Sequence, residues 1–548
     1  MHLCVMVKNA WYLLFILLYG TNSFAQPRTL GLTQWDKDYA DGYVLFTPLA
    51  SKNTYLIDAC GKQVHTWTST YTSGTFQTLL NDGSLLRAGL VAPPRFGLGS
   101  GGVIEKINWS GNVSWTFKIA DSNQYLHHDF HIMPNGHILA IVWERKTPAE
   151  AIAHGRDPNL SAPSVWSERI IEIEPFYDND SAEIIWEWSA WDHVIQDYDN
   201  TKPNFGVVAN NPHRLNLNYT GDNYQDWLHI NSVSYNAGLD QIIVSAHSTS
   251  EIFILDHSTN VIQSAGHSGG TYGKGGDLLY RWGNPAAYNR ANPADQRLFR
   301  QHHAHWIPTG FDNAGKIMVF NNGWGRQSGN YSSIDIIEPP TSAPGVYSLL
   351  SSQPYGPVSA VEYYKNPTPS KFYSQVLSGA YSLPDGGLFI TAGTSGDFFR
   401  TDKNKNIVWN YINPVDQNGV GKQGSTPGNN MVFRAEFYAA NFPGFSGKNL
   451  SASVEIETSP IQPALCDVSN QTEAIQSLVT GLYPNPAEDL VVISGTMAQK
   501  ATLYSTDGRK LMEFENTAVL DLKTLAPGCY HVIVVQDALV QQHTLLKQ

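Results

Sequence analysis

Short apolar runs alternate with polar residues along most of the chain, and tight-turn residues interrupt them. Three interruptions read Leu-Asn-Asp-Gly at 80–83, Met-Pro-Asn-Gly at 133–136 and Leu-Pro-Asp-Gly at 383–386. Asn-Gly and Asp-Gly pairs favour the positive φ angles of short hairpin loops, so each interruption predicts a strand, a turn and a second strand. The pattern is typical of an all-β protein.

A second pattern accompanies these hairpins, in which an aromatic ring stands two residues from a tryptophan. The series comprises His65/Trp67, Trp115/Phe117, Trp186/Trp188 and Trp409/Tyr411. Because side chains alternate faces along a strand, both rings of a pair lie on one face. With the apolar runs between them, the two patterns predict a repeated four-stranded meander.

Six such units are predicted, at about 42–72, 74–120, 126–196, 226–264, 301–350 and 374–416. Six twisted meanders around one axis make a six-bladed β-propeller. A β-sandwich with irregular hairpins is the alternative, and the repeated aromatic signature argues against it. The first unit lacks one strand, and we expect residues 431–438 to complete it and close the ring, because closure removes exposed sheet edges.

The first 25 residues have the form of a secretory signal peptide. Lys8 precedes an apolar run at 11–19, and Ser-Phe-Ala at 23–25 offers a cleavage site before Gln26. No later stretch reaches the roughly 20 apolar residues of a spanning helix, so no transmembrane segment is expected. We expect a signal peptide over 1–25, the propeller over 26–455 and a Ser-, Thr- and Pro-containing linker over 456–480.

Charge and cysteine content narrow the function. A net charge of −13, with 35 Lys and Arg spread thinly, lacks the clustered basic face that nucleic-acid binding requires. Without the leader, Cys60, Cys466 and Cys529 remain, so at most one disulfide forms within the chain. The fold must therefore rest on its hydrophobic core.

Residues 481–548 form a separate unit. Tyr-Pro-Asn-Pro at 483–486 precedes four predicted strands, and Thr-Asp-Gly-Arg at 506–509 and Gly-Cys-Tyr at 528–530 follow. These motifs resemble the C-terminal sorting domain of the type IX secretion system of Bacteroidota. The resemblance implies a small Ig-like β-sandwich, the type IX machinery as partner, and export through the periplasm and outer membrane to the cell surface or medium. A carbohydrate-binding sandwich is the alternative.

Histidines are concentrated in the predicted propeller, where 15 of the 18 lie between His65 and His305. Clusters at 127–131, 229 and 302–305 stand where predicted units open. The opening strand of a blade lines the central channel, so the clusters are expected to converge on one cavity, although any single histidine can instead be a satisfied structural residue. Arg326 follows a predicted strand and is expected at the same channel, because a guanidinium binds tetrahedral oxyanions.

Several stretches of this region resemble the arylsulfotransferase family, whose members use aryl sulfates instead of a nucleotide sulfate donor. The stretches are 226–232, 273–285, 301–306, 320–326, 378–386 and 441–450, and the resemblance covers about 40–455. It implies a six-bladed propeller that transfers a sulfuryl group from an aryl sulfate to a phenolic acceptor through a channel histidine, with no cofactor. Small aromatic sulfates and phenols are then the substrates.

By this resemblance His229 matches the first histidine that holds the sulfuryl oxygens, His302 the second with His305 as the alternative, and Arg326 the arginine. In the family the nucleophilic histidine follows that arginine, whereas no histidine stands between His305 and His531 here. Either His128 or His131 takes that role, or transfer is direct, or the chain has a different activity.

Three functions therefore remain open: a secreted sulfotransferase, a ligand-binding propeller without turnover, and another histidine-based chemistry, such as that of a metal-dependent hydrolase or lyase. The His-x-x-x-His spacing at 127–131 lies in a predicted strand rather than a helix, and no cysteine pair supports it, so no metal ligand is assigned. A quinone-dependent dehydrogenase is disfavoured, because its adjacent cysteine pair is absent.

Overall fold

The structure is a computed structural model and describes residues 27–39, 41–160, 162–221, 225–462, 464–467, 481–493, 498–506, 509–536 and 539–548. The predicted signal peptide at 1–25 and much of the predicted linker, residues 468–480, lie outside the described residues. Within them the chain is all-β, with many antiparallel sheets and few, short helices. The helical segments include α1 (Pro148–Ala153), α2 (Val261–Ser264), η1 (Lys37–Tyr39), η2 (Ala190–His193), η3 (Val208–Asn210), η4 (Pro285–Tyr288), η5 (Pro293–Asp295), η6 (Pro369–Lys371), η7 (Gly393–Ser395) and η8 (Pro443–Phe445).

Most strands between residues 31 and 438 belong to six antiparallel sheets, numbered here in chain order. Sheet 1 holds β31 (Glu436–Tyr438), β2 (Tyr43–Phe46), β3 (Asn53–Asp58) and β4 (Gln63–Thr68). Sheet 2 holds β5 (Ser73–Leu79), β6 (Leu85–Leu90), β7 (Gly102–Ile107) and β8 (Val113–Lys118). Sheet 3 holds β9 (Gln124–Ile132), β10 (Ile138–Lys146), β11 (Val165–Phe176) and β12 (Ser181–Ser189).

The remaining three sheets follow the same order along the chain. Sheet 4 holds β15 (Ile230–Asn236), β16 (Gln241–Ala246), β17 (Glu251–Asp256) and β18 (Tyr280–Trp282). Sheet 5 holds β19 (His302–Trp306), β20 (Ile317–Asn321), β21 (Ser333–Ile337) and β24 (Val361–Tyr364). Sheet 6 holds β25 (Gly379–Ser382), β26 (Leu388–Ala392), β27 (Asp397–Thr401), β28 (Ile407–Ile412) and, as a fifth strand, β1 (Gly31–Trp35).

Three short strand pairs lie outside these sheets. They are β13 (Val194–Ile195) with β14 (Leu215–Asn216), β22 (Thr341–Ala343) with β23 (Val346–Tyr347), and β29 (Val415–Asp416) with β30 (Gly419–Val420).

In two of the predicted units, 226–264 and 301–350, the C-terminal boundary was placed too early. The fourth strand of sheet 4 is β18 and that of sheet 5 is β24, and each follows a long connection that hides it in the sequence.

The three predicted turns join the first and second strands of sheets 2, 3 and 6. In each, the backbone N–H of the first turn residue donates to the carbonyl four residues later, as from Leu80 to Ser84 at 2.8 Å and from Met133 to His137 at 2.8 Å. Gly136 has φ +88°, a conformation that residues with a Cβ rarely adopt. The turn residues therefore set where the first strand of each sheet ends.

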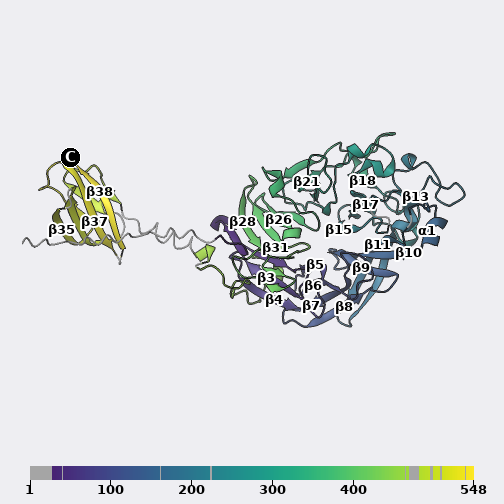
Figure 1. Ribbon diagram of the computed structural model, residues 1–548, viewed down its shortest axis with the longest axis horizontal. Coiled ribbons are helices and arrows are strands. Elements are labelled where there is room, and N and C mark those ends of the chain that lie inside the picture. Colours follow the sequence, from purple (N-terminus) through teal and green to yellow (C-terminus); the bar gives the residue numbers. More distant parts are fainter. Residues whose placement is uncertain are drawn as a thin grey trace, which may run out of the picture.

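The hydrophobic core lies between neighbouring sheets. Separate clusters of buried apolar side chains join sheets 1 and 2, 2 and 3, 3 and 4, 4 and 5, and 5 and 6, and a further cluster joins sheet 6 back to sheet 1. In that last cluster Phe46 of β2 packs against Phe398 of β27, with ring centroids 5.1 Å apart. The six sheets thus pack in a closed succession, and Figure 1 shows β5, β9, β15 and β31 toward the middle of this part and β4 and β8 at its edge.

The closing strand comes from the far end of the domain. β31 pairs antiparallel with β2, so that Tyr43 stands opposite Tyr438, as predicted for residues 431–438. The edge that β2 would otherwise expose is covered.

The tryptophan signature connects the sheets. It lies on the fourth strand of a sheet. In three of the four pairs an indole N–H donates to a backbone carbonyl in or beside the next sheet: Trp115 to Ser181 at 2.8 Å, Trp188 to Gly276 at 2.8 Å and Trp409 to Ala59 at 2.8 Å. A buried indole needs such an acceptor, and the ring supplies a large apolar surface beside it. The repeat in the sequence is therefore a repeat of inter-sheet contacts.

Residues 481–548 form two antiparallel sheets around a common core. One holds β32 (Leu482–Tyr483), β33 (Leu490–Ile493) and β36 (Val519–Asp521), and the other holds β35 (Lys510–Thr517), β34 (Ala498–Ser505), β37 (Gly528–Gln536) and β38 (Leu539–Lys547). Val491 and Leu520 of the first sheet and Leu503 and Val532 of the second are buried in that core. Of the three cysteines among the described residues, Cys60 and Cys466 form a disulfide and Cys529 is free and exposed.

Candidate functional site

Five histidines from sheets 3, 4 and 5 lie ring against ring in a row. From His127 to His128, His229, His247 and His302 the successive ring centroids are 5.1, 4.5, 5.0 and 5.4 Å apart. They come from β9, from the residue before β15, from the residue after β16 and from β19. We call these five residues the histidine row; it joins residues 175 positions apart, as from His127 to His302 (302 − 127).

Irregular backbone points these side chains at one another. His128 and His229 have φ angles of 52° and 51°, and His303, beside the row, has 51°. The pairing register shifts next to each of them, in β9, β15 and β19. A left-handed φ at a residue other than glycine costs on the order of 1–3 kcal/mol, and such residues cluster at functional sites. A β-bulge changes the direction in which a side chain points. The sheets are therefore distorted where the histidines meet.

His229 is oriented by a carboxylate. Its Nδ1 lies 2.5 Å from Oδ2 of Asp226, and its side chain is 17% exposed. A carboxylate only accepts hydrogen bonds, so Nδ1 carries the proton and Nε2 of the neutral imidazole keeps its lone pair. This is the arrangement in which an imidazole acts as a nucleophile or a base.

A second carboxylate reaches the row through His127. Glu168 Oε2 lies 2.8 Å from His127 Nε2, and His127 Nδ1 lies 2.8 Å from His128 Nδ1. Burial raises the pKa of Glu168 well above its usual range, and the neighbouring Asp226 raises it further. When Glu168 is ionised the relay leaves a lone pair on Nε2 of His128, and when Glu168 is protonated it leaves a proton there.

Burial also keeps the rest of the row neutral. It lowers the pKa of His127, His128 and His247 well below the usual range and lowers that of His302 to about 3. His302 Nδ1 lies 2.8 Å from the side-chain oxygen of Asn322, and its Nε2 accepts the N–H of Leu377 at 3.2 Å. His302 therefore has both ring nitrogens occupied, unlike His229.

A cavity of about 820 Å³ is lined by residues of the first strand of all six sheets. His131, His303 and His305 line it, together with Tyr381 and Arg434. Burial and the positive charge of Arg434 lower the pKa of His131 and His305 to about 4. A cavity of this size takes a small aromatic ligand.

The structure brings together three of the five predicted site residues. His128, His229 and His302 belong to the row, whereas His305 lines the cavity, where its ring stacks on that of His303 at 4.3 Å. Arg326 has other neighbours: its guanidinium lies 2.6 Å from the Ser333 hydroxyl, 3.6 Å from Glu362 and over the Tyr331 ring. The arginines whose charges act on these histidines are Arg300, at His247, and Arg434, at His302 and His305.

Sequence reasoning missed Glu168, His247 and Arg434. Glu168 stands inside a strand and Arg434 inside an irregular segment, and neither carries a motif. His247 follows β16 directly, and the end of a predicted strand before a turn was the one signal available for it. Residues of this kind can be identified only in the folded structure, where distant segments of the chain come together.

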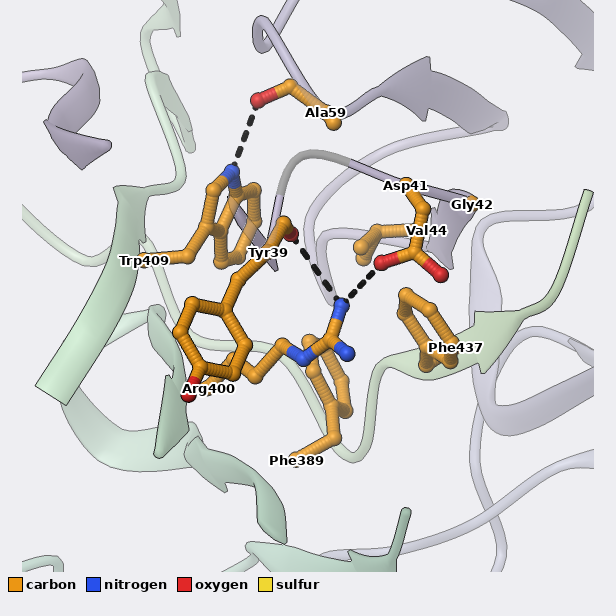
Figure 2. Close-up of a pocket in the computed structure, with 9 residues that line it drawn as sticks. All are labelled: Tyr39, Asp41, Gly42, Val44, Ala59, Phe389, Arg400, Trp409 and Phe437. Atoms are coloured by element: carbon orange, nitrogen blue, oxygen red, sulfur yellow. Dashed lines mark hydrogen bonds and ion pairs between the residues drawn. The ribbon is translucent and has the colours of Figure 1, made fainter. Parts of the chain in front are cut away.

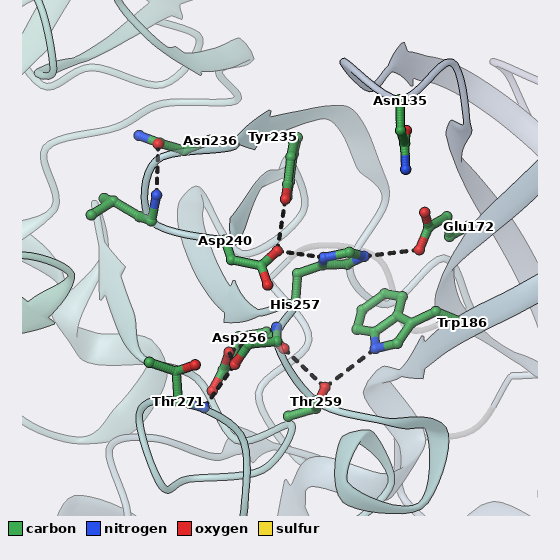
Figure 3. A network of polar contacts seen from close by, with 12 residues as sticks. Asn135, Glu172, Trp186, Tyr235, Asn236, Asp240, Asp256, His257, Thr259 and Thr271 are labelled. Carbon is green, nitrogen blue, oxygen red and sulfur yellow. Dashed lines mark hydrogen bonds and ion pairs between the residues drawn. The ribbon is translucent and has the colours of Figure 1, made fainter.

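Two other polar clusters serve packing. His257 lies between Asp240 at 2.7 Å and Glu172 at 3.0 Å, which raises its pKa and ties sheet 4 to sheet 3 (Figure 3). Between sheets 6 and 1, Arg400 bonds Asp41 beside Tyr39 in a pocket of about 10 Å³ (Figure 2). That volume holds about one water molecule, so it offers no ligand site.

Comparison with known proteins decides the family. The model of the arylsulfotransferase (ASST) family matches residues 33–434, which include the whole histidine row. The chain belongs to the arylsulfotransferase family. The model of the secretion system C-terminal sorting domain matches residues 481–548. The protein is thus a secreted arylsulfotransferase-like protein that type IX secretion delivers to the cell surface or the medium, as the sequence predicted, with the secretion machinery as its partner.

Solved structures similar to this family member share little sequence with it. A putative 6-phosphogluconolactonase from Bacteroides fragilis is 8% identical, with 74% of this chain and 99% of that chain covered and a TM-score of 0.34. Virginiamycin B lyase from Staphylococcus aureus is 13% identical, with 72% and 87% covered and a TM-score of 0.33. No curated protein matched the sequence. Among the described residues no helix has the length and apolarity needed to cross a membrane.

Proposed function

We propose that the chain moves a sulfuryl group from an aryl sulfate to a phenolic acceptor, with the histidine row as the reacting site. The observation that carries the proposal is the Asp226–His229 pair, in which a carboxylate fixes the tautomer of a histidine whose side chain is 17% exposed. Family membership supplies the reaction class. The geometry supports the assignment of the residues that perform the reaction.

His229 is the proposed nucleophile. Its Nε2 lone pair attacks sulfur, the bond from sulfur to the aryl oxygen breaks, and the phenolate leaves with the electron pair. In the second half of the reaction the oxygen of the acceptor phenol attacks sulfur, and the N–S bond breaks to return the electron pair to Nε2. Asp226 stabilises the cationic imidazole that exists between the two steps.

His128 is proposed to handle the protons. With Glu168 protonated, Nε2 of His128 carries the proton that the departing phenolate takes up. With Glu168 ionised, the same nitrogen removes the proton of the acceptor phenol. One relay thus serves both half-reactions, since each leaves the Glu168–His127–His128 chain in the state that the other requires.

His302, His305 and Arg326 are proposed ligands of the sulfuryl oxygens by their match to the family. To act so, His302 must exchange its hydrogen bonds with Asn322 and Leu377, and Arg326 its hydrogen bond with Ser333. Arg300 and Arg434 are the cations that act electrostatically on the histidines. We add them as candidates for charge stabilisation, because three sulfuryl oxygens need several donors.

The test is release of p-nitrophenol from p-nitrophenyl sulfate with and without phenol as acceptor. We expect acceptor-dependent release that falls at least about 1,000-fold in His229→Ala, and mass spectrometry should find sulfate on His229 when acceptor is omitted. His154→Ala, which alters a histidine outside the row, is the matched control. Full activity of His229→Ala, or sulfate on another residue, would overturn the assignment.

A ligand-binding protein without turnover is the second candidate. It is favoured by the lack of any histidine from 306 to 530, the region in which the family has its nucleophilic histidine. Ser378, which opens one of the family-like stretches there, is buried and hydrogen-bonded to Ser374 at 2.8 Å. Absence of release with every acceptor, together with saturable binding of p-nitrophenyl sulfate, would establish it.

We further propose the domain layout that this function requires. The six sheets are six propeller blades within 26–455, the two C-terminal sheets are an Ig-like sandwich over 481–548, and 456–480 links them. A signal peptide over 1–25 supplies entry to the periplasm of a member of the Bacteroidota. N-terminal sequencing of the secreted protein should begin at Gln26.

A further inference from the structure

A cluster of metal-ligand side chains lies away from the histidine row. One ring nitrogen of His193, one of His267 and a carboxylate oxygen of Asp277 all lie within 4.8 Å of one another. Among the described residues, these three form the one group of at least three His, Cys, Asp or Glu side chains whose ligand atoms lie that close together. Its segments follow β12, follow α2 and precede β18, so the cluster stands at the outer strands of sheets 3 and 4.

The contacts within the cluster converge on one oxygen. Asp277 Oδ1 lies 2.9 Å from His193 Nδ1 and 2.8 Å from His267 Nδ1. Around a tetrahedral zinc ion with bonds of about 2.05 Å, ligand atoms stand about 3.3 Å apart. An outward shift of about 0.5 Å would bring each nitrogen–oxygen distance to that value.

The hydrogen bonds of His193 leave its inner nitrogen facing an acceptor. Nε2 lies 2.8 Å from the backbone carbonyl of Ser264, which only accepts, so Nε2 carries the proton. Nδ1 faces the Asp277 carboxylate at 2.9 Å, so the position between them holds a cation, either the proton of an imidazolium or a metal ion in its place. A carbonyl on the outer nitrogen is also what commonly holds a zinc-bound histidine in its tautomer.

The surroundings suit a bound ion. His193 is fully buried and Asp277 is 4% exposed, whereas the side chain of His267 is 41% exposed and gives the ion a route from solvent. His213 Nε2 lies 3.7 Å from Asp277 Oδ2 and is the nearest candidate for a fourth ligand. A Cβ on Gly276 would lie 2.5 Å from His193 Nε2, so the backbone leaves room for the ring. Arg214 also lies 3.7 Å from Oδ2, but Oδ1 faces the two imidazoles.

We propose that His193, His267 and Asp277 bind one zinc ion, with His213 or a water as fourth ligand, and that the ion clamps sheet 3 to sheet 4. Nitrogen and oxygen donors in this number select zinc over the harder magnesium and calcium ions. The three ligands come from three segments of the chain, so the bound ion closes loops between sheets 3 and 4, which also meet through apolar packing and the His257 hydrogen bonds.

The test uses the full chain dialysed against zinc chloride and then against buffer, with metal content measured by mass spectrometry. We expect one zinc per chain, a rise in Tm of about 3 °C at a zinc concentration 100-fold above Kd, and the visible absorption of tetrahedral cobalt when cobalt chloride replaces zinc.

His267→Ala should lose the ion, and its half-exposed position leaves folding intact. His154→Ala is the control and should keep the ion, and Asp277→Asn is a second variant that should lose it. A parent chain without zinc, or a His267→Ala variant that holds as much as the parent, overturns the proposal. The result is independent of sulfuryl transfer, because no step of the readout uses that activity.

Discussion

A buried ion pair joins the closing segment of the ring to sheet 3. Arg434 Nη2 lies 2.8 Å from Asp129 Oδ1, and the two side chains are 4% and 1% exposed. The guanidinium also lies over the Phe76 ring at 4.1 Å, and Asp129 accepts the backbone N–H of Val233 at 3.3 Å. One pair therefore touches sheets 2, 3 and 4.

Asp129→Asn should destabilise the fold strongly, because it leaves an arginine buried without its counter-charge. An arginine cannot lose its proton in a protein, so it cannot escape the penalty, and breaking a buried pair from one side costs about 3–5 kcal/mol. With an unfolding entropy of about 2.1 cal/mol/K per residue over roughly 400 residues, a loss of about 4 kcal/mol lowers Tm by about 5 °C.

Arg434→Met should behave differently as pH changes. Burial already raises the pKa of Asp129, and without Arg434 it rises further, so the folded variant binds a proton more readily than the unfolded chain. Stability gained by that proton is present at low pH and is lost as pH rises through the folded pKa, so the deficit relative to the parent shrinks from pH 7 to pH 5.

Thermal and urea unfolding at pH 7 and pH 5, followed by tryptophan fluorescence, measure both effects. The double variant Asp129→Asn/Arg434→Met is the control and should recover much of the loss, since neither member of the pair is then left as a buried charge without the other. An Asp129→Asn protein within about 1 kcal/mol of the parent, or an Arg434→Met deficit equal at both pH values, would refute this reasoning.

Three further outcomes are expected. The pKa values of His131, His302 and His305, near 4, 3 and 4, lie below their unfolded value near 6.5, so stability should fall by about 1.4 kcal/mol per pH unit for each as pH drops from 6.5 to about 4. Tm measured across that range checks this; His302→Asn should flatten the slope, and a flat parent profile would contradict it. Gly99→Ala should displace His128 and reduce sulfuryl transfer, because its Cβ would lie 2.0 Å from the His128 ring, whereas Gly111→Ala, with a similar φ and nothing within 4 Å, controls for backbone strain. Equal transfer rates in the two variants would count against the role of His128. Deleting 481–548 should keep the chain from the surface and the medium, and cell fractionation with immunoblotting would detect normal export if the tag were dispensable.

Periodicity and turn chemistry predicted most of the fold. The Asn-Gly and Asp-Gly turns at 80–83, 133–136 and 383–386 end first strands because only a few residue types tolerate positive φ, which is a local constraint. The tryptophan spacing marked fourth strands, because the indoles of Trp115, Trp188 and Trp409 each bond a carbonyl in or beside the next sheet. Strands β18 and β24 escaped detection, because three or four residues after a long loop carry too little pattern.

The sequence by itself determined the family, the sorting tag and the histidine clusters at which three of the predicted units open. Only the tertiary structure decided which histidines meet: His128, His229 and His302 share a row with His247, whereas His305 lines the cavity and Arg326 packs against Tyr331 and Glu362. The physical reason is that a bulge or a left-handed φ turns a side chain by one face, and such irregularities depend on packing between sheets rather than on local propensity.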